Sequence, residues 1–217
     1  MLKNYQLRNH QTGDVLYEGR FETLKQCVES AVHQRINLSY VDLRNANLSH
    51  ANLDDANMES ANLSGANLCG ANMSEGVFDC ANFSNADVTY ACFVQSSFKN
   101  SNFTKSSFAV TDMTDAVVEG CVFSCPSVFN MQFHRTEKFS NNMFMDGDKA
   151  VPMNKIPVMV VGLSRDIVYL DNHIKIGMDF VDKTDLIAAG DRHLEFIYGR
   201  EVATFIRPVL YENIVNL

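Results

Sequence analysis

The sequence predicts a mainly β protein whose central part, residues 36–135, is a regular coil of very short strands. Three observations predict it. Every fifth residue from position 38 to position 133 is apolar, at twenty positions without a break. The residue two places before each of these centres is small at sixteen of the twenty sites, most often Ala. The residue one place before the centre is Asn at nine sites and Asp at three.

A period of five fits neither an α-helix, which buries residues at intervals of about 3.6, nor a plain strand, which buries every second residue. It fits short extended segments that end in tight corners, because a centre and the small residue two places earlier then share one face. Asn and Asp tolerate unusual backbone conformations and hydrogen-bond their own chain at turns. A chain that turns every five residues is able to coil on itself and pair each segment with the coil above.

Individual repeats carry a family resemblance. Ala46-Asn47-Leu48-Ser49-His50, Ala61-Asn62-Leu63-Ser64-Gly65 and Ala66-Asn67-Leu68-Cys69-Gly70 resemble the words of the pentapeptide-repeat family. The resemblance implies a right-handed, quadrilateral parallel β-helix with four words in each coil, and therefore about five coils over residues 36–135. It covers 100 of the 217 residues. The motif is specific for the fold and not for a function.

Residues 1–35 are expected to cap the first coil. Residues 4–9 and 15–18 alternate as two short strands around a turn, which predicts a hairpin. Residues 22–34 have apolar side chains at helical spacing, which predicts an amphipathic helix. Because the open end of a β-helix exposes strand edges and core, this helix is expected to cover it. The alternative is a helix that binds a partner.

The five-residue pattern ends after Arg135, because position 138 is Lys. Residues 136–155 are rich in turn residues and predict a loop or linker, or a cap on the C-terminal end of the coil. Residues 156–217 predict a small α+β domain. Its expected elements are a hairpin over 157–161 and 167–170, a strand over 173–177, and helices over 183–189 and 191–206. The stretch 160–177 is similar to a tail on pentapeptide-repeat proteins of tailed bacteriophages, which implies a phage-encoded protein.

Composition excludes several classes of function. The net charge of −8 argues against a basic nucleic-acid-binding surface, so no direct nucleic-acid binding is expected. No apolar run is long enough to span a bilayer, and the N-terminus lacks a signal-peptide core, so we expect no membrane contact and a cytoplasmic location, the host cytoplasm if the protein is viral. The six Cys residues are then expected to be reduced. No His or Cys spacing suits a metal, and no phosphate loop or nucleophile motif occurs, so we expect no cofactor and no enzyme activity.

The charge of the central segment is concentrated on two adjoining faces. Residues 36–135 contain ten acidic and four basic residues, a net charge of −6. Outward positions after the fourth and the first column of centres carry seven carboxylates and one Lys, while the other two faces are nearly uncharged. The seven candidate partner-binding residues are Asp54, Asp55, Glu59, Glu75, Asp79, Asp115 and Glu119. One interpretation is that they keep the rod soluble. The other is that they imitate the phosphates of duplex DNA.

Three hypotheses of function follow. The best-known members of the resembling family inhibit or protect DNA gyrase as DNA-shaped dimers. The first hypothesis is therefore a non-enzymatic, phage-encoded inhibitor that binds a host protein, a DNA-handling or antiviral defence enzyme, through its acidic β-helix surface. The second is a structural or assembly protein whose rod spaces terminal interaction domains. The third is an enzyme confined to residues 156–217. A homodimer through the C-terminal region is also expected.

Overall fold

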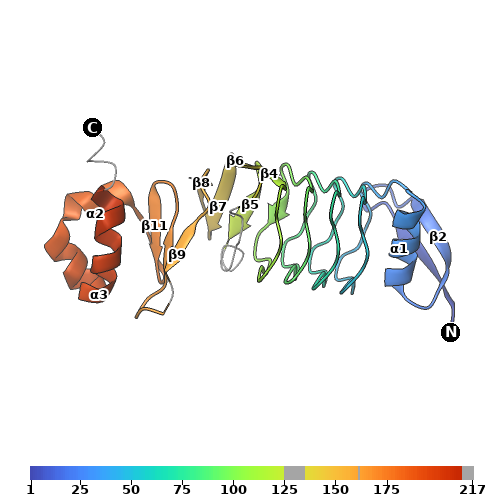
Figure 1. Cartoon of the computed structure of the whole chain (residues 1–217), viewed down its shortest axis with the longest axis horizontal. Helices are drawn as coiled ribbons and strands as arrows, with labels where there is room; N and C mark the ends of the chain where they lie inside the picture. Colours follow the sequence, from blue (N-terminus) through green and yellow to red (C-terminus); the bar gives the residue numbers. More distant parts are fainter. Residues whose placement is uncertain (125–134, 161, 212–217) are drawn as a thin grey trace. The chain divides into compact units, whose positions relative to one another are not determined.

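The computed structural model describes residues 1–124, 135–160 and 162–211. It divides into two compact units, Met1–Ala150 and Val151–Leu217. Figure 1 shows the first unit as a stack of coils that begins next to a hairpin and a helix.

Successive coils are joined by parallel pairing between residues that lie twenty positions apart. Asn62 pairs with Asp42 below it and with Asn82 above it. The Leu43 amide donates to the Asn62 carbonyl at 2.9 Å, and the Asn62 amide donates to the Val41 carbonyl at 2.9 Å. The longest extended pieces of the repeats are strands β3 (Asn102–Phe103), β4 (Val117–Glu119) and β5 (Val122–Ser124). The prediction of a mainly β, coiled architecture is confirmed.

The apolar centres form the core. All eighteen centres from Leu38 to Phe123 are buried. The Phe rings stack along the coil axis, with ring centroids 4.9 Å apart for Phe83 and Phe103 and 5.4 Å apart for Phe103 and Phe123. The five-residue register is therefore confirmed as far as residue 124. The last two predicted centres, Val128 and Phe133, lie outside the described residues.

The small position two places before the centre changes from Ala to Ser along the chain without loss of burial. The buried hydroxyls of Ser96 and Ser101 donate to the carbonyls of Met73 and Phe78, each at 2.7 Å. These carbonyls belong to corners of the coil below. Each bond offsets the cost of burying the polar hydroxyl.

The corners are β-turns with an unusual backbone at one fixed place. The Ala66 amide donates to the Leu63 carbonyl at 3.0 Å and closes such a turn. The second residue after the centre has a positive φ, for example 66° at Gly65, as a type II turn requires. The Asn before the centre was expected to hydrogen-bond its own chain at the turn, and this is confirmed. The Asn62 side chain accepts a bond from the Ser64 amide at 3.2 Å and fixes the turn from outside.

Val110 is the least favourable occupant of a corner. It has φ of 55° and is 59% exposed, and a β-branched side chain is rarely found in this region. Val110→Asn should therefore raise the stability by about 1 kcal/mol, which corresponds to a gain of about 2–4 °C in melting temperature. Asn85→Val, at an equivalent exposed corner with φ of 58°, should lower it by a similar amount. If neither melting temperature moved, strain at the corners would be the wrong explanation.

The N-terminal elements are those that the sequence predicted. Strands β1 (Lys3–Arg8) and β2 (Val15–Phe21) form an antiparallel hairpin, and helix α1 (Leu24–His33) follows. The Thr23 side chain caps the helix by accepting a bond from the Gln26 amide. The apolar face of α1, which includes Cys27, Val28 and Ala31, is buried.

The hairpin and α1 also satisfy backbone groups on the open edge of the first coil. The Asp42 amide donates to the Arg8 carbonyl at 2.8 Å, so the hairpin replaces a missing coil below. The Asn52 amide donates to the Glu29 carboxylate of α1 at 3.0 Å. These bonds remove part of the edge that would otherwise pair with another chain.

The coil continues past Arg135, which corrects the expectation of a loop in this stretch. Strands β6 (Lys138–Ser140) and β7 (Asn142–Asp146) pair in parallel with β4 and β5. Phe139 and Phe144 take the places of centres. The pairing offset is twenty-one residues here, since Val118 pairs with Phe139, so a fixed five-residue count misses them by one position. Strand β8 (Lys149–Met153) is next to β7 in the same sheet and leads to the second unit.

Asn142 occupies the inward position two places before a centre, where the coils below have Cys121, Ser101 and Ala81. Its side chain is fully buried. The Asn142 carbonyl oxygen accepts a bond from the Cys121 amide at 2.8 Å, and its amide nitrogen donates to the Val118 carbonyl at 3.2 Å. The larger side chain thus bonds two buried backbone groups of the coil below, next to the change in pairing offset.

The second unit is an antiparallel sheet followed by helices. The sheet order is β12 (Asp179–Asp182), β11 (His173–Ile176), β10 (Ile167–Tyr169) and β9 (Val158–Val160). Helices α2 (Lys183–Ala189) and α3 (Asp191–Tyr211) follow, and α3 is kinked at Gly199. The hairpin, the third strand and both helices were predicted, whereas β12 was not. Buried Ile174, Leu194 and Val202 contribute to their common core.

Candidate protein-binding surface

One row of acidic residues follows the corners after the fourth column of centres. Asp55, Glu75 and Asp115 stand at equivalent turn positions with φ between 55° and 58°, and Gln95 interrupts the row. Asp54 precedes Asp55 in its turn. The side chains are exposed because the corner directs the residue after the centre away from the core. Neighbouring members of the row are one or two coils apart.

A second row follows the first column of centres and is partly used by the fold itself. Glu59 is exposed, but Asp79 is half-buried. The Asp79 carboxylate accepts bonds from the Ser97 hydroxyl at 2.6 Å and the Lys99 amide at 2.9 Å, so it fastens one coil to the next. We therefore correct the expectation that every one of the seven acidic side chains is available to a partner.

Glu119, the last member of the second row, is half-buried and paired. The Lys138 ammonium lies 2.7 Å from its carboxylate. The bond from Lys138 holds the pKa of Glu119 below its usual range, and Asn141 and the charge of Lys99 act in the same direction. Lys138 belongs to β6, where a loop, linker or cap was expected, so the repeat pattern did not indicate this pair.

The structure thus divides the seven predicted residues into two groups. Five of them are exposed on the repeats, namely Asp54, Asp55, Glu59, Glu75 and Asp115. Asp79 and Glu119 are half-buried and bonded to neighbouring coils.

Two Arg residues stand at the ends of the corner row, twenty residues before Asp55 and twenty after Asp115. An Arg35 guanidinium nitrogen lies 3.8 Å from an Asp55 carboxylate oxygen, and the two side chains are 85% and 64% exposed. An ion pair this exposed contributes little to stability. The Asp115 amide donates to the Arg135 carbonyl at 2.8 Å. Arg35 was missed because it precedes the first centre, although its spacing of twenty from Asp55 is visible in the sequence.

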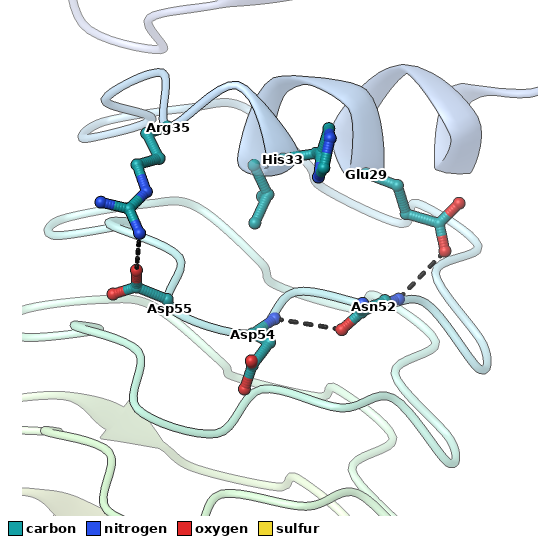
Figure 2. Close-up of a pocket in the computed structure, with 7 residues that line it drawn as sticks. Glu29, His33, Arg35, Asn52, Asp54 and Asp55 are labelled. Carbon is teal, nitrogen blue, oxygen red and sulfur yellow. Dashed lines mark hydrogen bonds and ion pairs between the residues drawn. The ribbon is translucent and has the colours of Figure 1, made fainter.

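A pocket of about 350 Å³ lies between α1 and the first coil, at the end of the acidic rows (Figure 2). The residues that line it are Glu29, Val32, His33, Arg35, Asn52, Asp54 and Asp55. Glu29 is held by the Asn52 amide, and the Asn52 side chain accepts a bond from the Asp54 amide at 3.4 Å. The hydrogen bonds drawn in Figure 2 therefore fix the pocket wall, and the charges of both signs leave no single electrostatic preference.

The five Cys residues that the structure describes differ in exposure, and the most buried of the repeats is unreactive. Cys121 is inward, as expected, and burial raises the pKa of its thiol to about 12, so it stays protonated near neutral pH. Cys80 is exposed at a corner, and Cys69 is half-buried. Cys125 lies outside the described residues. Within residues 1–124, 135–160 and 162–211, no cluster of three His, Cys, Asp or Glu side chains is arranged to hold a metal ion.

Among the described residues, no helix has both the length and the apolar character needed to cross a membrane. This result concerns the two described units only.

Comparison with known proteins identifies the repeats. The family model for pentapeptide repeats matches eight copies, over residues 36–74 and 81–124. The interruption between the two ranges contains Gly76 and Val77, which replace the usual Ala and Asn. No curated protein matches the chain.

Several solved structures of repeat proteins resemble the chain. A pentapeptide repeat protein from the thylakoid lumen of Arabidopsis thaliana is 24% identical, with 37% of this chain and 63% of that one covered and a TM-score of 0.23. Trypsin-treated QnrB1, a plasmid-mediated fluoroquinolone resistance protein, is 16% identical, with 46% and 58% covered and a TM-score of 0.36. A pentapeptide repeat protein from Nostoc is 19% identical, with 57% and 96% covered and a TM-score of 0.24.

The match therefore spans less than two thirds of the Arabidopsis and QnrB1 chains. The assignment rests on the family model together with the paired corners and buried centres of residues 36–124. Residues 36–74 and 81–124 of this chain are therefore identified as pentapeptide repeats.

Proposed function

We propose that this chain is a non-enzymatic inhibitor that binds a DNA-handling or antiviral defence enzyme through its acidic repeat surface. The observation that carries the proposal is the row of exposed carboxylates at equivalent corners, Asp55, Glu75 and Asp115, with Asp54 and Glu59 beside it. Clusters of one sign of charge on a rigid scaffold attract a partner of the opposite sign. The natural complement is the basic groove of an enzyme that binds DNA.

The geometry of the rows supports mimicry of a nucleic acid. Successive coils are separated by about 4.8 Å, the spacing of paired strands. Phosphates along one strand of duplex DNA follow each other at about 3.4 Å of axial rise, whereas members of the acidic row, one or two coils apart, follow at about 5–10 Å, so the two charge densities agree within a factor of about three. In the proposed form the repeats make about five four-sided, right-handed coils, and the acidic rows occupy two adjoining sides. A phage origin, with the host enzyme as target in the host cytoplasm, completes the proposal.

The second candidate is a spacer that holds interaction domains apart. The observation that favours it is on the C-terminal unit, where Phe196 is 88% exposed and Phe205 is 44% exposed on α3. Exposed aromatic side chains of this size are typical of interaction surfaces. If the chain is such a spacer, the carboxylates of the repeats only keep the rod soluble.

The same side chains support the proposal of a homodimer through the C-terminal region. At micromolar concentration we expect the full chain to sediment as a dimer. The double variant Phe196→Glu and Phe205→Glu should sediment as a monomer, because it places charges in the apolar contact. A full chain that sedimented as a monomer would rule out this dimer.

Charge reversal tests the acidic surface. Asp54, Glu59, Glu75 and Asp115 are exposed, and the structure gives their carboxylates no ion pair within the described residues. Each change from a carboxylate to Lys raises the net charge by two, so the four together raise it from −8 to zero. Lys105 already occupies the turn position equivalent to Glu75 and Asp115, with φ of 58°, and Lys99 occupies the position equivalent to Asp54 and Glu59, so the fold should tolerate Lys at all four sites. We expect the variant to lose binding to a basic partner at least tenfold, and most strongly at low salt.

A matched variant controls for net charge. Glu22, Asp148, Asp166 and Asp185 are exposed acids outside the repeats, and their reversal to Lys also gives a net charge of zero. This control should bind the partner as the parent chain does. An equal loss of partner binding in both variants would show that the net charge of the chain determines binding and that the acidic rows do not. Retained binding by the first variant would favour the spacer.

A further inference from the structure

Two exposed apolar side chains occupy the corners that follow the buried centres Val88 and Phe108. Among the described corner residues with positive φ, Tyr90 and Val110 are the two that are large, apolar and exposed, at 64% and 59%. They stand twenty residues apart, at equivalent corners of consecutive coils, and the Tyr90 amide donates to the Ala109 carbonyl at 2.8 Å. The two side chains therefore form one apolar strip, which the proposed function does not use.

The fold itself gains nothing from an apolar side chain at these corners. Tyr90 and Val110 have φ of 57° and 55°, a conformation that favours Gly and Asn and that β-branched residues rarely adopt. Asn45 and Asn85 adopt the same conformation with a polar side chain. A strained corner that holds an apolar side chain in water points to a role outside the fold, and adjacent exposed apolar groups are typical of surfaces that bind a partner.

The apolar strip lies close to carboxylates of the repeats. Asp115, a member of the acidic corner row, is five residues after Val110, which limits their separation to about 17 Å, and Asp112 lies between them. Both Asp residues are exposed. The bond from the Thr114 hydroxyl, followed by that from the Thr114 amide, holds the pKa of Asp112 below its usual range, so this carboxylate is charged near neutral pH. Apolar and acidic groups thus fit within one interface of about 800 Å² per partner.

We propose that Tyr90, Val110, Asp112 and Asp115 form a mixed surface that selects a basic partner with aromatic side chains between its cations. The inference rests on the proposed function, because the carboxylates supply the attraction to a basic groove. Carboxylates alone attract any cationic surface. The apolar strip adds affinity only where the partner places an aromatic ring against it, since Tyr is among the residues that contribute most to interface affinity and its ring stacks on aromatic and guanidinium groups.

The test uses two hexapeptides of equal charge, one of alternating Arg and Trp and one of alternating Arg and Ser. Calorimetric titration of the full chain at low salt should show at least tenfold tighter binding of the Trp peptide. The double variant Tyr90→Asn and Val110→Asn should bind the Ser peptide as the parent chain does and lose the preference for the Trp peptide. The charge-reversed variant described above should weaken the binding of both peptides.

Melting temperature separates a lost contact from a lost fold. Because Asn is present at equivalent corners, the double variant should melt at or above the temperature of the parent chain. The matched control is Asn45→Ser with Asn85→Ser, at two exposed corners outside the apolar strip. Ser60 already occupies an equivalent corner with φ of 57°, so this control should fold, and it should keep both peptide affinities.

The outcomes distinguish this inference from the proposed function. Equal affinity of the parent chain for the two peptides, or an unchanged preference in the folded double variant, would overturn the inference and leave the acidic surface in place. If the charge-reversed variant bound the Ser peptide as tightly as the parent chain does, the proposed function would fail, and the inference with it. Absence of binding by both peptides would also overturn the inference.

Discussion

Phe103→Asp should unfold the repeats. Phe103 is fully buried between the rings of Phe83 and Phe123, at centroid distances of 4.9 and 5.4 Å. The substitution removes a large apolar side chain, at a cost of about 3–5 kcal/mol, and adds a buried carboxylate with no partner. Since a domain is stable by only about 5–15 kcal/mol, the melting transition should fall by tens of degrees or disappear.

The control for this variant is Asn102→Asp. It introduces the same charge one residue earlier, at a position that points outward. Asp occurs at equivalent positions in this chain, at Asp42, Asp87 and Asp112, and the carboxylate is able to keep the bond from the Thr104 amide. Far-ultraviolet circular dichroism and melting temperature should be nearly unchanged. If Phe103→Asp also melted like the parent chain, the five-residue register would be wrong.

Asn142→Ala should be the most destabilising substitution of a polar residue in the first unit. It leaves two buried backbone groups, the Cys121 amide and the Val118 carbonyl, without the side-chain bonds of 2.8 and 3.2 Å. A buried group without a partner costs about 1–3 kcal/mol, so the free energy of unfolding should fall by about 3 kcal/mol.

Asn62→Ala is the matched comparison. Asn62 is half-buried on the outer side of a corner, where water is able to replace its bond to the Ser64 amide. Loss of this bond should lower the free energy of unfolding by less than about 1 kcal/mol. Urea denaturation of both variants measures the difference. Equal urea midpoints for the two variants would mean that the side-chain bonds of Asn142 contribute no more to stability than the bond of Asn62.

The sequence predicted the repeats well because one physical requirement recurs at a fixed interval. Each centre from Leu38 to Phe123 must be apolar to fill the coil, so the pattern could be counted. The helix at α1 and the elements of the C-terminal unit were found by ordinary periodicity and turn residues. Strands β6 and β7 were missed because one additional residue in the pairing offset moved Phe139 and Phe144 out of the count.

The candidate surface was predicted only in part, for a different reason. The repeat pattern alone determines which side chains point away from the core, and Asp54, Glu59 and Glu75 are exposed as expected. Whether a carboxylate is available depends on residues in the next coil. The partners of Asp79 and Glu119 are Ser97 and Lys138, which lie eighteen and nineteen residues further along the chain. Such pairs become visible once the coil length is used to align successive turns.

Competition with duplex DNA tests the central claim most directly. The chain would be immobilised and used to capture DNA-binding enzymes from the cells in which the protein acts, and a duplex of about 30 base pairs would then be added. The account predicts that the duplex releases the captured enzyme, that the reversal of Asp54, Glu59, Glu75 and Asp115 prevents capture, and that capture weakens as salt rises. An enzyme that binds the chain and the duplex together, with equal affinity for the charge-reversed variant, would contradict it.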